Sequence, residues 1–173
     1  MNKLILASIF FTTLTLTACD KKTENNASSE TEVSKQKVTL SKNVNADIKH
    51  DLGIIDEISA KKAEEALKFQ PEVSKAVQNN NKAELKAIVE KMETYVDQFN
   101  DDLDKLPLKS TEGLSVKEKL KDANKLGLDL AEEGIKEKPD SKEINELQDK
   151  AIKLQHEILT EVQDLKKRTD TKS

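Results

Sequence analysis

Few side chains of this 173-residue sequence have the chemistry of a reactive or metal-binding group. Cys19 is the only cysteine, and it lies where an apolar run ends and a charged stretch begins. A thiolate is a good nucleophile, whereas a single thiol cannot form a disulfide within the chain. The two histidines are His50 and His156, and carboxylates cluster in "NDDLD" at 100–104 and "AEEG" at 131–134. Which of these groups can act together depends on the elements that carry them.

The segment before Cys19 has the pattern of a secretory signal peptide. Lys3 precedes the apolar run "LILASIFFTTLTLTA", which is shorter than the roughly 20 apolar residues that span a bilayer. A basic start, a short apolar run and small residues at the end predict a signal peptide over residues 1–18. The run closes with Leu16-Thr17-Ala18-Cys19, which resembles the lipobox of bacterial lipoproteins. The alternative is a transmembrane anchor with an incidental cysteine.

The resemblance to lipoproteins implies a chemistry for Cys19. Diacylglycerol would be attached to its sulfur, the chain would be cleaved after Ala18, and the new amine would be acylated, for example with palmitate. Two or three acyl chains anchor a protein stably where one does not. We therefore expect a lipid anchor at the bacterial cell membrane, in the inner or the outer membrane. Asp20 resembles a retention signal and favours the periplasmic face of the inner membrane, although Lys21 weakens that signal.

The remaining reactive residues do not form a catalytic or cofactor-binding pattern. Di-metal helical bundles use Glu-x-x-His pairs, and the sequence has none. At about 100° per residue, His50 and His156 fall on the faces that point to water. Met92 lies in an apolar stripe and His156 does not, so a methionine–histidine haem ligand pair is missing. We expect no catalytic residues, no metal and no cofactor, and the carboxylate clusters are interpreted as solvated helix faces.

Composition favours a helical domain behind a tether. The sequence has 29 Lys and Arg against 33 Asp and Glu, with only four glycines and three prolines. Mixed charges with an acidic balance argue against a nucleic-acid partner. The polar stretch 20–43 cannot bury enough apolar surface to fold by itself. The predicted organisation is a signal peptide (1–18), a lipidated flexible tether (19–45), a helical bundle domain (46–168) and a disordered tail (169–173).

Apolar residues recur every three or four positions in four stretches, near 47–69, 81–106, 115–135 and 140–165. Candidate N-caps are Asp47, Asn81, Ser115 and Asp140, and Pro71 predicts a break near residue 70. Together these features predict an all-α, antiparallel four-helix bundle with up-down-up-down connections. Its core would be one narrow seam, and Gly127 would allow a close helix crossing.

These elements support two hypotheses about function. The leading hypothesis is a non-catalytic lipoprotein of the cell envelope that acts as an adaptor or chaperone-like module and binds an unidentified envelope protein. The alternative is a bundle that binds a small apolar or haem-like ligand between its helices. In that case Met92, Tyr95 and Phe99, which share the apolar face of the second helix, would line the site.

Overall fold

The computed structural model describes residues 39–170, and this part of the chain is all-α, as predicted. The signal peptide, the lipobox with Cys19, most of the tether and residues 171–173 lie outside the described residues. The described helices are α2 (Asn45–Ala66), α3 (Phe69–Gln78), α4 (Lys82–Asp104), α5 (Thr111–Ile135) and α6 (Ser141–Asp170). Within this range, none of the helices combines the length and apolar character needed to cross a bilayer.

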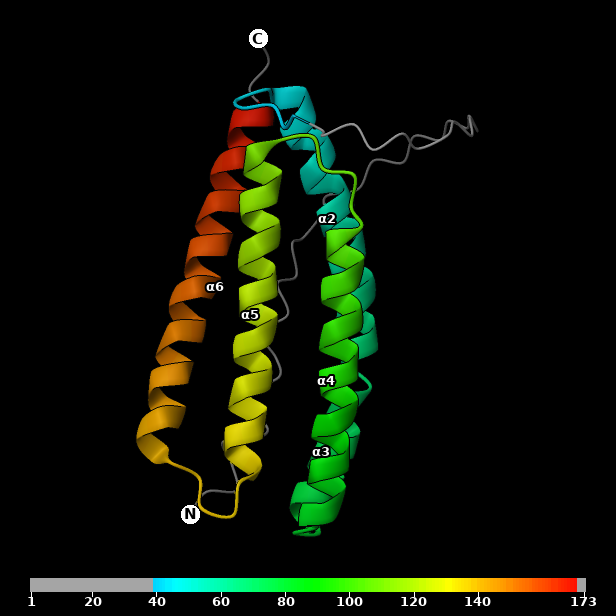
Figure 1. The fold of residues 1–173 in the computed structure, drawn as a ribbon, viewed down its shortest axis with the longest axis vertical. Coiled ribbons are helices and arrows are strands. Elements are labelled where there is room, and N and C mark those ends of the chain that lie inside the picture. Colours follow the sequence, from blue (N-terminus) through cyan, green and yellow to red (C-terminus); the bar gives the residue numbers. More distant parts are fainter. Residues whose placement is uncertain (1–38, 171–173) are drawn as a thin grey trace.

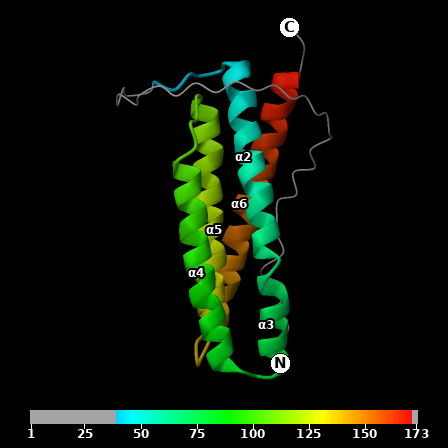
Figure 2. The ribbon, with the colours of Figure 1, turned by 90° about the vertical axis from the view of Figure 1, so that its right-hand side faces the viewer.

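The helices lie side by side along one long axis (Figure 1). In this view α2 starts at the top and α3 continues its course to the bottom, after which α4 runs upward, α5 downward and α6 upward. Both ends of the described chain therefore lie at the top, beside the loop that joins α4 to α5. The view turned by 90° shows α3 beside the lower part of α4 (Figure 2).

The first leg is broken at residues 67–68, which separate α2 from α3. The predicted break near residue 70 is present but lies two to three residues earlier, and Pro71 is not its cause. Pro71 is the third residue of α3, within the first turn, where a backbone N–H has no intrahelical partner and proline costs little. Leu67 falls within the apolar stretch near 47–69, but it lies in the break and is 46% exposed.

Two of the predicted N-caps are present. The Glu84 N–H donates to Asn81 Oδ1 at 3.1 Å at the start of α4. The Lys142 N–H donates to Asp140 Oδ1 at 2.8 Å at the start of α6. Each bond satisfies one of the N–H groups that a helix leaves unpaired at its N-terminus.

The other two N-caps were predicted wrongly. Helix α5 starts at Thr111 rather than at Ser115, and the cap is Ser110, whose Oγ accepts from the Gly113 N–H at 3.0 Å. Helix α2 starts at Asn45, before Asp47, and its N-cap Val44 makes no side-chain cap bond. In both cases contacts with distant parts of the chain, described next, determine where the helix begins.

The top of the molecule is held by a buried carboxylate. Asp51 on α2 is fully buried, and it accepts hydrogen bonds from the Lys109 N–H at 2.9 Å, the Ser110 N–H at 2.7 Å and the Ser110 hydroxyl at 2.6 Å. Burial alone would raise the pKa of Asp51, but the bonds from Ser110, His50 and Lys109 lower it below its ordinary value. A Cβ on Gly113 would lie 2.6 Å from the Asp51 Cβ, so this contact requires glycine.

The last residues of the predicted tether are fastened to the same place. The Ser41 N–H donates to the Lys109 carbonyl at 2.8 Å, and the Thr111 N–H donates to the Ser41 carbonyl at 2.9 Å. The Asn43 N–H donates to Glu112 Oε1 at 2.9 Å, and this carboxylate also pairs with Arg168 on α6 at 3.1 Å. We call this end of the molecule the closed end; it comprises residues 41–51, 105–113 and 165–170.

The core consists of two clusters rather than the single seam that was predicted. The upper cluster contains Ile48, Leu52, Ile55, Phe99, Leu103, Val116, Leu120, Ile158, Val162 and Leu165. The lower cluster contains Val73, Ala76, Ile88, Val89, Met92 and Ala131. Helix α6 contributes only to the upper cluster, and α3 only to the lower one. The helices are thus held together differently above and below the middle of the molecule.

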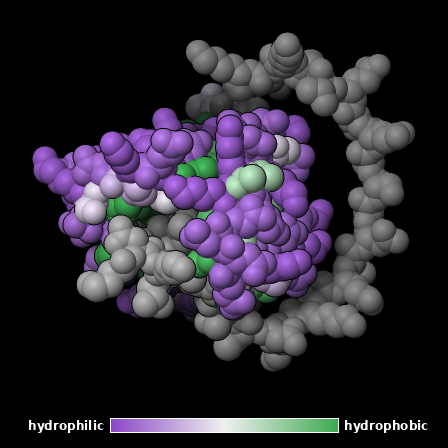
Figure 3. Space-filling model, turned by 90° about the horizontal axis from the view of Figure 1, so that it is seen from below, coloured by the Kyte–Doolittle hydropathy of each residue, from purple (hydrophilic) through white to green (hydrophobic). Residues whose placement is uncertain are grey.

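Outside this core the surface is polar. Seen from below, hydrophilic residues dominate, and hydrophobic residues show only as small patches between them (Figure 3). This agrees with the dense, mixed charges of the sequence. An apolar recess within such a surface is therefore an informative feature.

Candidate functional site

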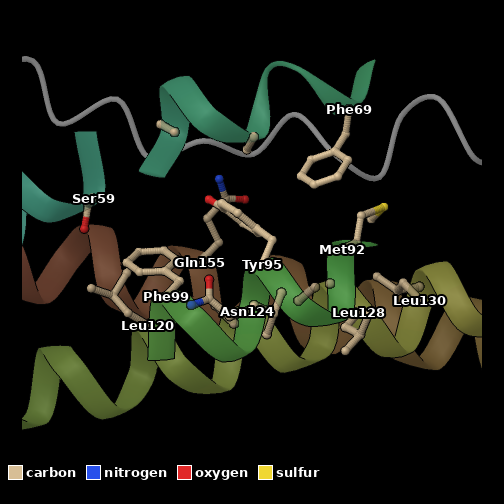
Figure 4. A pocket seen from close by; sticks show the side chains of 16 residues that line it. Ser59, Phe69, Met92, Tyr95, Phe99, Leu120, Asn124, Leu128, Leu130 and Gln155 are labelled. Atoms are coloured by element: carbon tan, nitrogen blue, oxygen red, sulfur yellow. The ribbon is translucent and has the colours of Figure 1, made fainter. Parts of the chain in front are cut away.

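A cavity of about 210 Å³ lies at the middle of the molecule, between residues of the upper and the lower cluster. All five described helices contribute to its lining (Figure 4). The lining residues are Ser59, Ala63, Ala66, Phe69, Met92, Tyr95, Val96, Phe99, Leu120, Ala123, Asn124, Gly127, Leu128, Leu130, Ala151 and Gln155. The site is concave and mostly apolar with a few polar groups, which is the usual character of small-molecule sites.

Three aromatic rings form one part of the lining. The rings of Phe69 and Tyr95 meet edge to face, with centroids 5.6 Å apart, and Phe99 follows at 6.3 Å from Tyr95. Figure 4 shows the three rings in a row, with Tyr95 in the middle. Such pairs have the favourable geometry of packed aromatic side chains, so the rings support one another as a fixed surface.

The Tyr95 ring is held in place at its polar end. Its hydroxyl donates to the Lys62 carbonyl at 2.7 Å. Burial, together with the negative charge of Glu65, raises the pKa of Tyr95 to about 12. The phenol therefore stays neutral at physiological pH and acts as part of the apolar lining rather than as an acid or a base.

Five small residues also belong to the lining, beside larger apolar residues such as Met92, Leu120, Leu128 and Leu130. Helices α2, α5 and α6 present alanine or glycine at positions where large apolar residues would fill a core: Ala63, Ala66, Ala123, Gly127 and Ala151. A Cβ built on Gly127 would have no atom within 4 Å. The prediction that Gly127 allows a close helix crossing is therefore wrong, because this glycine borders empty space.

Three polar side chains reach the cavity. Ser59 Oγ is buried and has no hydrogen-bond partner among residues 39–170. The Asn124 amide donates to Asn100 Oδ1 at 3.0 Å, and Gln155 extends from α6 in the direction of the Tyr95 hydroxyl (Figure 4). These groups could orient a ligand, whereas no charged side chain belongs to the lining.

Lys62, a cation next to the Tyr95 ring, is paired with two carboxylates. The side chain of Lys62 is 7% exposed, and its Nζ lies 3.1 Å from Asp102 and 3.4 Å from Glu65. Burial alone would lower the pKa of Lys62, but the bonds to Asp102 and Glu65 raise it. Lys62 therefore stays charged and paired, with its Nζ over the Tyr95 ring at 5.8 Å from the ring centroid.

Exposed apolar residues adjoin the lining in the chain. Leu67 lies between the lining residues Ala66 and Phe69, and Ile152 follows the lining residue Ala151. Leu67 is 46% exposed and Ile152 is 64% exposed. Together with Val44 at the closed end, they are the large hydrophobic residues that the described part of the chain leaves exposed.

Some of the predictions made for single residues agree with the structure and others do not. Met92, Tyr95 and Phe99 all line the cavity, where the ligand hypothesis places them. His156 is exposed as expected, but His50 is only partly exposed because its Nδ1 lies 3.1 Å from the buried Asp51. No group of three or more possible metal ligands occurs in residues 39–170.

The two carboxylate clusters, at 100–104 and 131–134, both form ion pairs with lysines. Asp104 pairs with Lys121 at 2.6 Å and with Lys117 at 2.9 Å. The bonds from these two lysines lower the pKa of Asp104, and they explain how α4 tolerates acidic residues at its C-terminus, where such charges are unfavourable. In the second run Glu133 is buried, pairs with Lys136 and accepts the Asp140 N–H at 2.9 Å. This run therefore holds the loop before α6 and is not a solvated face throughout.

Several lining residues were not predicted. Phe69 and Gln155 reach the cavity because the break at residues 67–68 and the course of α6 place them there, which no local pattern shows. The small residues carried a signal, since Ala63, Ala66, Ala123 and Ala151 occupy stripe positions that larger residues would fill.

These observations define the class of protein: an all-α domain with an apolar cavity at its middle. A family model described as "Uncharacterised lipoprotein PM1805" matches residues 45–170. The chain belongs to this lipoprotein family. This membership supports the prediction that the protein is a bacterial lipoprotein, and it suggests that a lipid anchor associates the protein with a membrane. Neither a curated protein nor a solved structure matches the chain. The matched region begins after Cys19, so the assignment of the lipid to Cys19 stays a prediction.

Proposed function

We propose that this lipoprotein binds a small apolar molecule in the cavity of its helical domain, without catalysing a reaction. The observation that carries the proposal is the lining, in which aromatic and aliphatic side chains surround an open space of about 210 Å³. The cavity is partly open to solvent, so its apolar side chains are in contact with water, which is unfavourable. A ligand that fills the cavity would remove this apolar surface from water.

The proposal combines this cavity with the predicted anchor. Cys19 would carry the lipid, and the helices would form an antiparallel, up-down-up-down bundle at the periplasmic face of the inner membrane. The directions of the helices in Figure 1 support the bundle. Labelling with palmitate tests the anchor: we expect Cys19→Ser to abolish it, and retained labelling would place the lipid on another residue.

Binding is tested with the mature chain from residue 19 onward, carrying Cys19→Ser so that neither lipid nor detergent competes for the probe. We expect benzene, naphthalene or octan-1-ol to raise the midpoint of thermal unfolding, and calorimetry to show saturable binding. If none of the three probes binds at its solubility limit, the proposal is wrong.

A matched pair of glycine variants locates the binding. In Gly127→Leu the new side chain would occupy the cavity, because no atom lies within 4 Å of its Cβ, and affinity should fall by more than about tenfold. Gly53→Leu is the control, since Gly53 is exposed on α2 and its Cβ also has no neighbour within 4 Å. Equal affinity in both variants would place the probe elsewhere.

A protein partner is the second candidate function, and the exposed Leu67 and Ile152 favour it. Large exposed apolar side chains beside a recess are typical of interaction surfaces. Replacing Ile152 with lysine should then weaken crosslinking to one defined envelope protein but leave the affinity for naphthalene unchanged. Unchanged crosslinking would contradict this second function and leave ligand binding intact.

A further inference from the structure

The cavity has features that restrict the charge of its ligand. None of its 16 lining residues is ionised at neutral pH, since Tyr95 is the only titratable one and its pKa is raised to about 12. Lys62, whose Nζ lies over the Tyr95 ring, is paired with Asp102 and Glu65. An ionic ligand would lose its hydration and find no counter-ion, which is strongly unfavourable. The ligand must therefore be neutral.

The lining also restricts the shape of the ligand. The row of Phe69, Tyr95 and Phe99 offers ring faces and edges (Figure 4). Helices α2, α5 and α6 present alanine and glycine, and α5 adds Leu120, Leu128 and Leu130. A flat ring can pack against aromatic side chains in offset or edge-to-face contact and still lie close to small residues on its other side. A flat molecule uses such a space better than a branched one.

The size of the cavity indicates one or two rings. An apolar cavity of about 150 Å³ engineered into another protein stays dry and binds benzene. The cavity of this protein is larger, at about 210 Å³, so a fused two-ring molecule is a reasonable upper size.

Polar groups in the lining point to a ligand that makes a hydrogen bond. Ser59 Oγ is buried without a partner among the described residues, and a buried hydroxyl that lacks a partner costs free energy. Gln155 brings an amide from α6 into the same cavity. A ligand with one hydroxyl, amino or carbonyl group could satisfy one of these side chains.

We infer that the ligand is a neutral, flat molecule of one or two rings that carries one hydrogen-bonding group, which Ser59 or Gln155 receives. This inference rests on the proposed function, because it names the class of ligand that the same cavity would hold. It makes a statement about each of three properties, namely charge, shape and polarity, and each can fail separately.

Three matched probes test the inference on the mature Cys19→Ser chain by isothermal calorimetry. They are 2-naphthol, naphthalene, which lacks the hydroxyl, and 2-naphthoate, which is ionised at pH 7. We expect 2-naphthol to bind about 3 to 10 times more tightly than naphthalene, the ratio expected for one hydrogen bond. The affinity of 2-naphthoate should be lower than that of 2-naphthol by more than about 100-fold.

Two conservative variants identify the hydrogen bond. In Ser59→Ala or in Gln155→Met, 2-naphthol should lose its advantage over naphthalene, while the affinity for naphthalene stays within about twofold. Naphthalene thus reports whether the cavity is still intact. If 2-naphthol keeps its advantage in both variants, neither side chain receives the polar group and the inference is wrong.

The result also separates this inference from the proposed function. Binding of 2-naphthoate as tight as that of 2-naphthol, or of octan-1-ol at least tenfold tighter than 2-naphthol, would overturn the ligand class but keep ligand binding. Failure of every probe would overturn both. Tighter binding of 2-naphthol that is lost in Gly127→Leu and kept in Gly53→Leu would support both.

Discussion

The closed end and the cavity region of this protein differ in the side chains and interactions that they contain. At the closed end, the buried Asp51 carboxylate accepts from N–H groups 58 and 59 residues further along the chain. A glycine contact and backbone hydrogen bonds join the same segments. In the cavity region, aromatic rings and small residues leave space, and the polar group of Ser59 has no partner within residues 39–170. The first arrangement fixes the helices relative to one another, whereas the second keeps room between them. The comparison shows how one helical domain can combine a closely bonded end with open space between its helices.

Among the variants that test this comparison, Asp51→Ala should change the free energy of unfolding the most. The substitution leaves the Lys109 and Ser110 N–H groups buried without an acceptor, and we expect the free energy of unfolding to fall by about 3 kcal/mol. Urea unfolding followed by circular dichroism measures the loss. Glu57→Ala, an exposed position on the same helix, is the control and should change stability by less than about 0.5 kcal/mol. A similar small change in Asp51→Ala would show that the closed end is not held by this carboxylate.

Gly113→Ala should have the next largest effect, because the added methyl group would collide with Asp51. Overpacking of this kind costs about 1–3 kcal/mol, whereas alanine is otherwise favoured over glycine within a helix. The control is Gly53→Ala, where the Cβ meets no atom within 4 Å, and it should stabilise the protein by about 0.5–1 kcal/mol. Stabilisation in both variants, measured by urea unfolding, would contradict the close contact.

The two regions should also respond to opposite extremes of pH. The lowered pKa of Asp51 contributes stability that is present above its unfolded value of about 4 and is lost as pH falls through the folded pKa. The raised pKa of Tyr95 contributes stability that is present below pH 10 and is lost as pH rises from 10.0 toward about 12. Urea midpoints across the pH range should therefore decrease at both ends.

Single variants separate these two effects. Asp51→Asn should flatten the acid limb and leave the alkaline limb unchanged, and Tyr95→Phe should do the reverse. If Tyr95→Phe left the alkaline limb as steep as before, the burial of the phenol would not be its cause.

Gly127→Ala should have the smallest effect and the opposite sign. The methyl group enters open space, so the gain in helix propensity of about 0.5–1 kcal/mol should appear in full. Affinity for naphthalene should change by less than about threefold, since most of the cavity remains. A loss of stability in urea unfolding would show that the space beside Gly127 is already filled.

Local patterns were sufficient to predict much of the helical structure. The all-α class, the caps at Asn81 and Asp140, and the shared face of Met92, Tyr95 and Phe99 all follow from residues that are near one another in the chain. Their physical causes, helix periodicity and capping, act over one or two turns.

The errors arise where distant segments decide the outcome. Ser110 replaces Ser115 as the N-cap because Asp51 and Ser41 hold residues 109–111 in place, and neither partner can be inferred from the sequence around Ser115. The cavity itself depends on alanine and glycine residues of three helices meeting the aromatic rings, which requires knowing how the helices pair. The lipid anchor predicted at Cys19 lies outside the described residues, and its prediction depends on the lipobox alone.

The pairing of Ser41 beside Ser110 determines where a mechanical load would enter the molecule. A pull on the chain ahead of residue 39 is borne first by the two backbone hydrogen bonds that join Ser41 to Lys109 and Thr111. These bonds lie at the closed end, away from the cavity. A force transmitted from the membrane through the tether would thus act first on the bonds between Ser41 and residues 109 and 111, which are separate from the cavity.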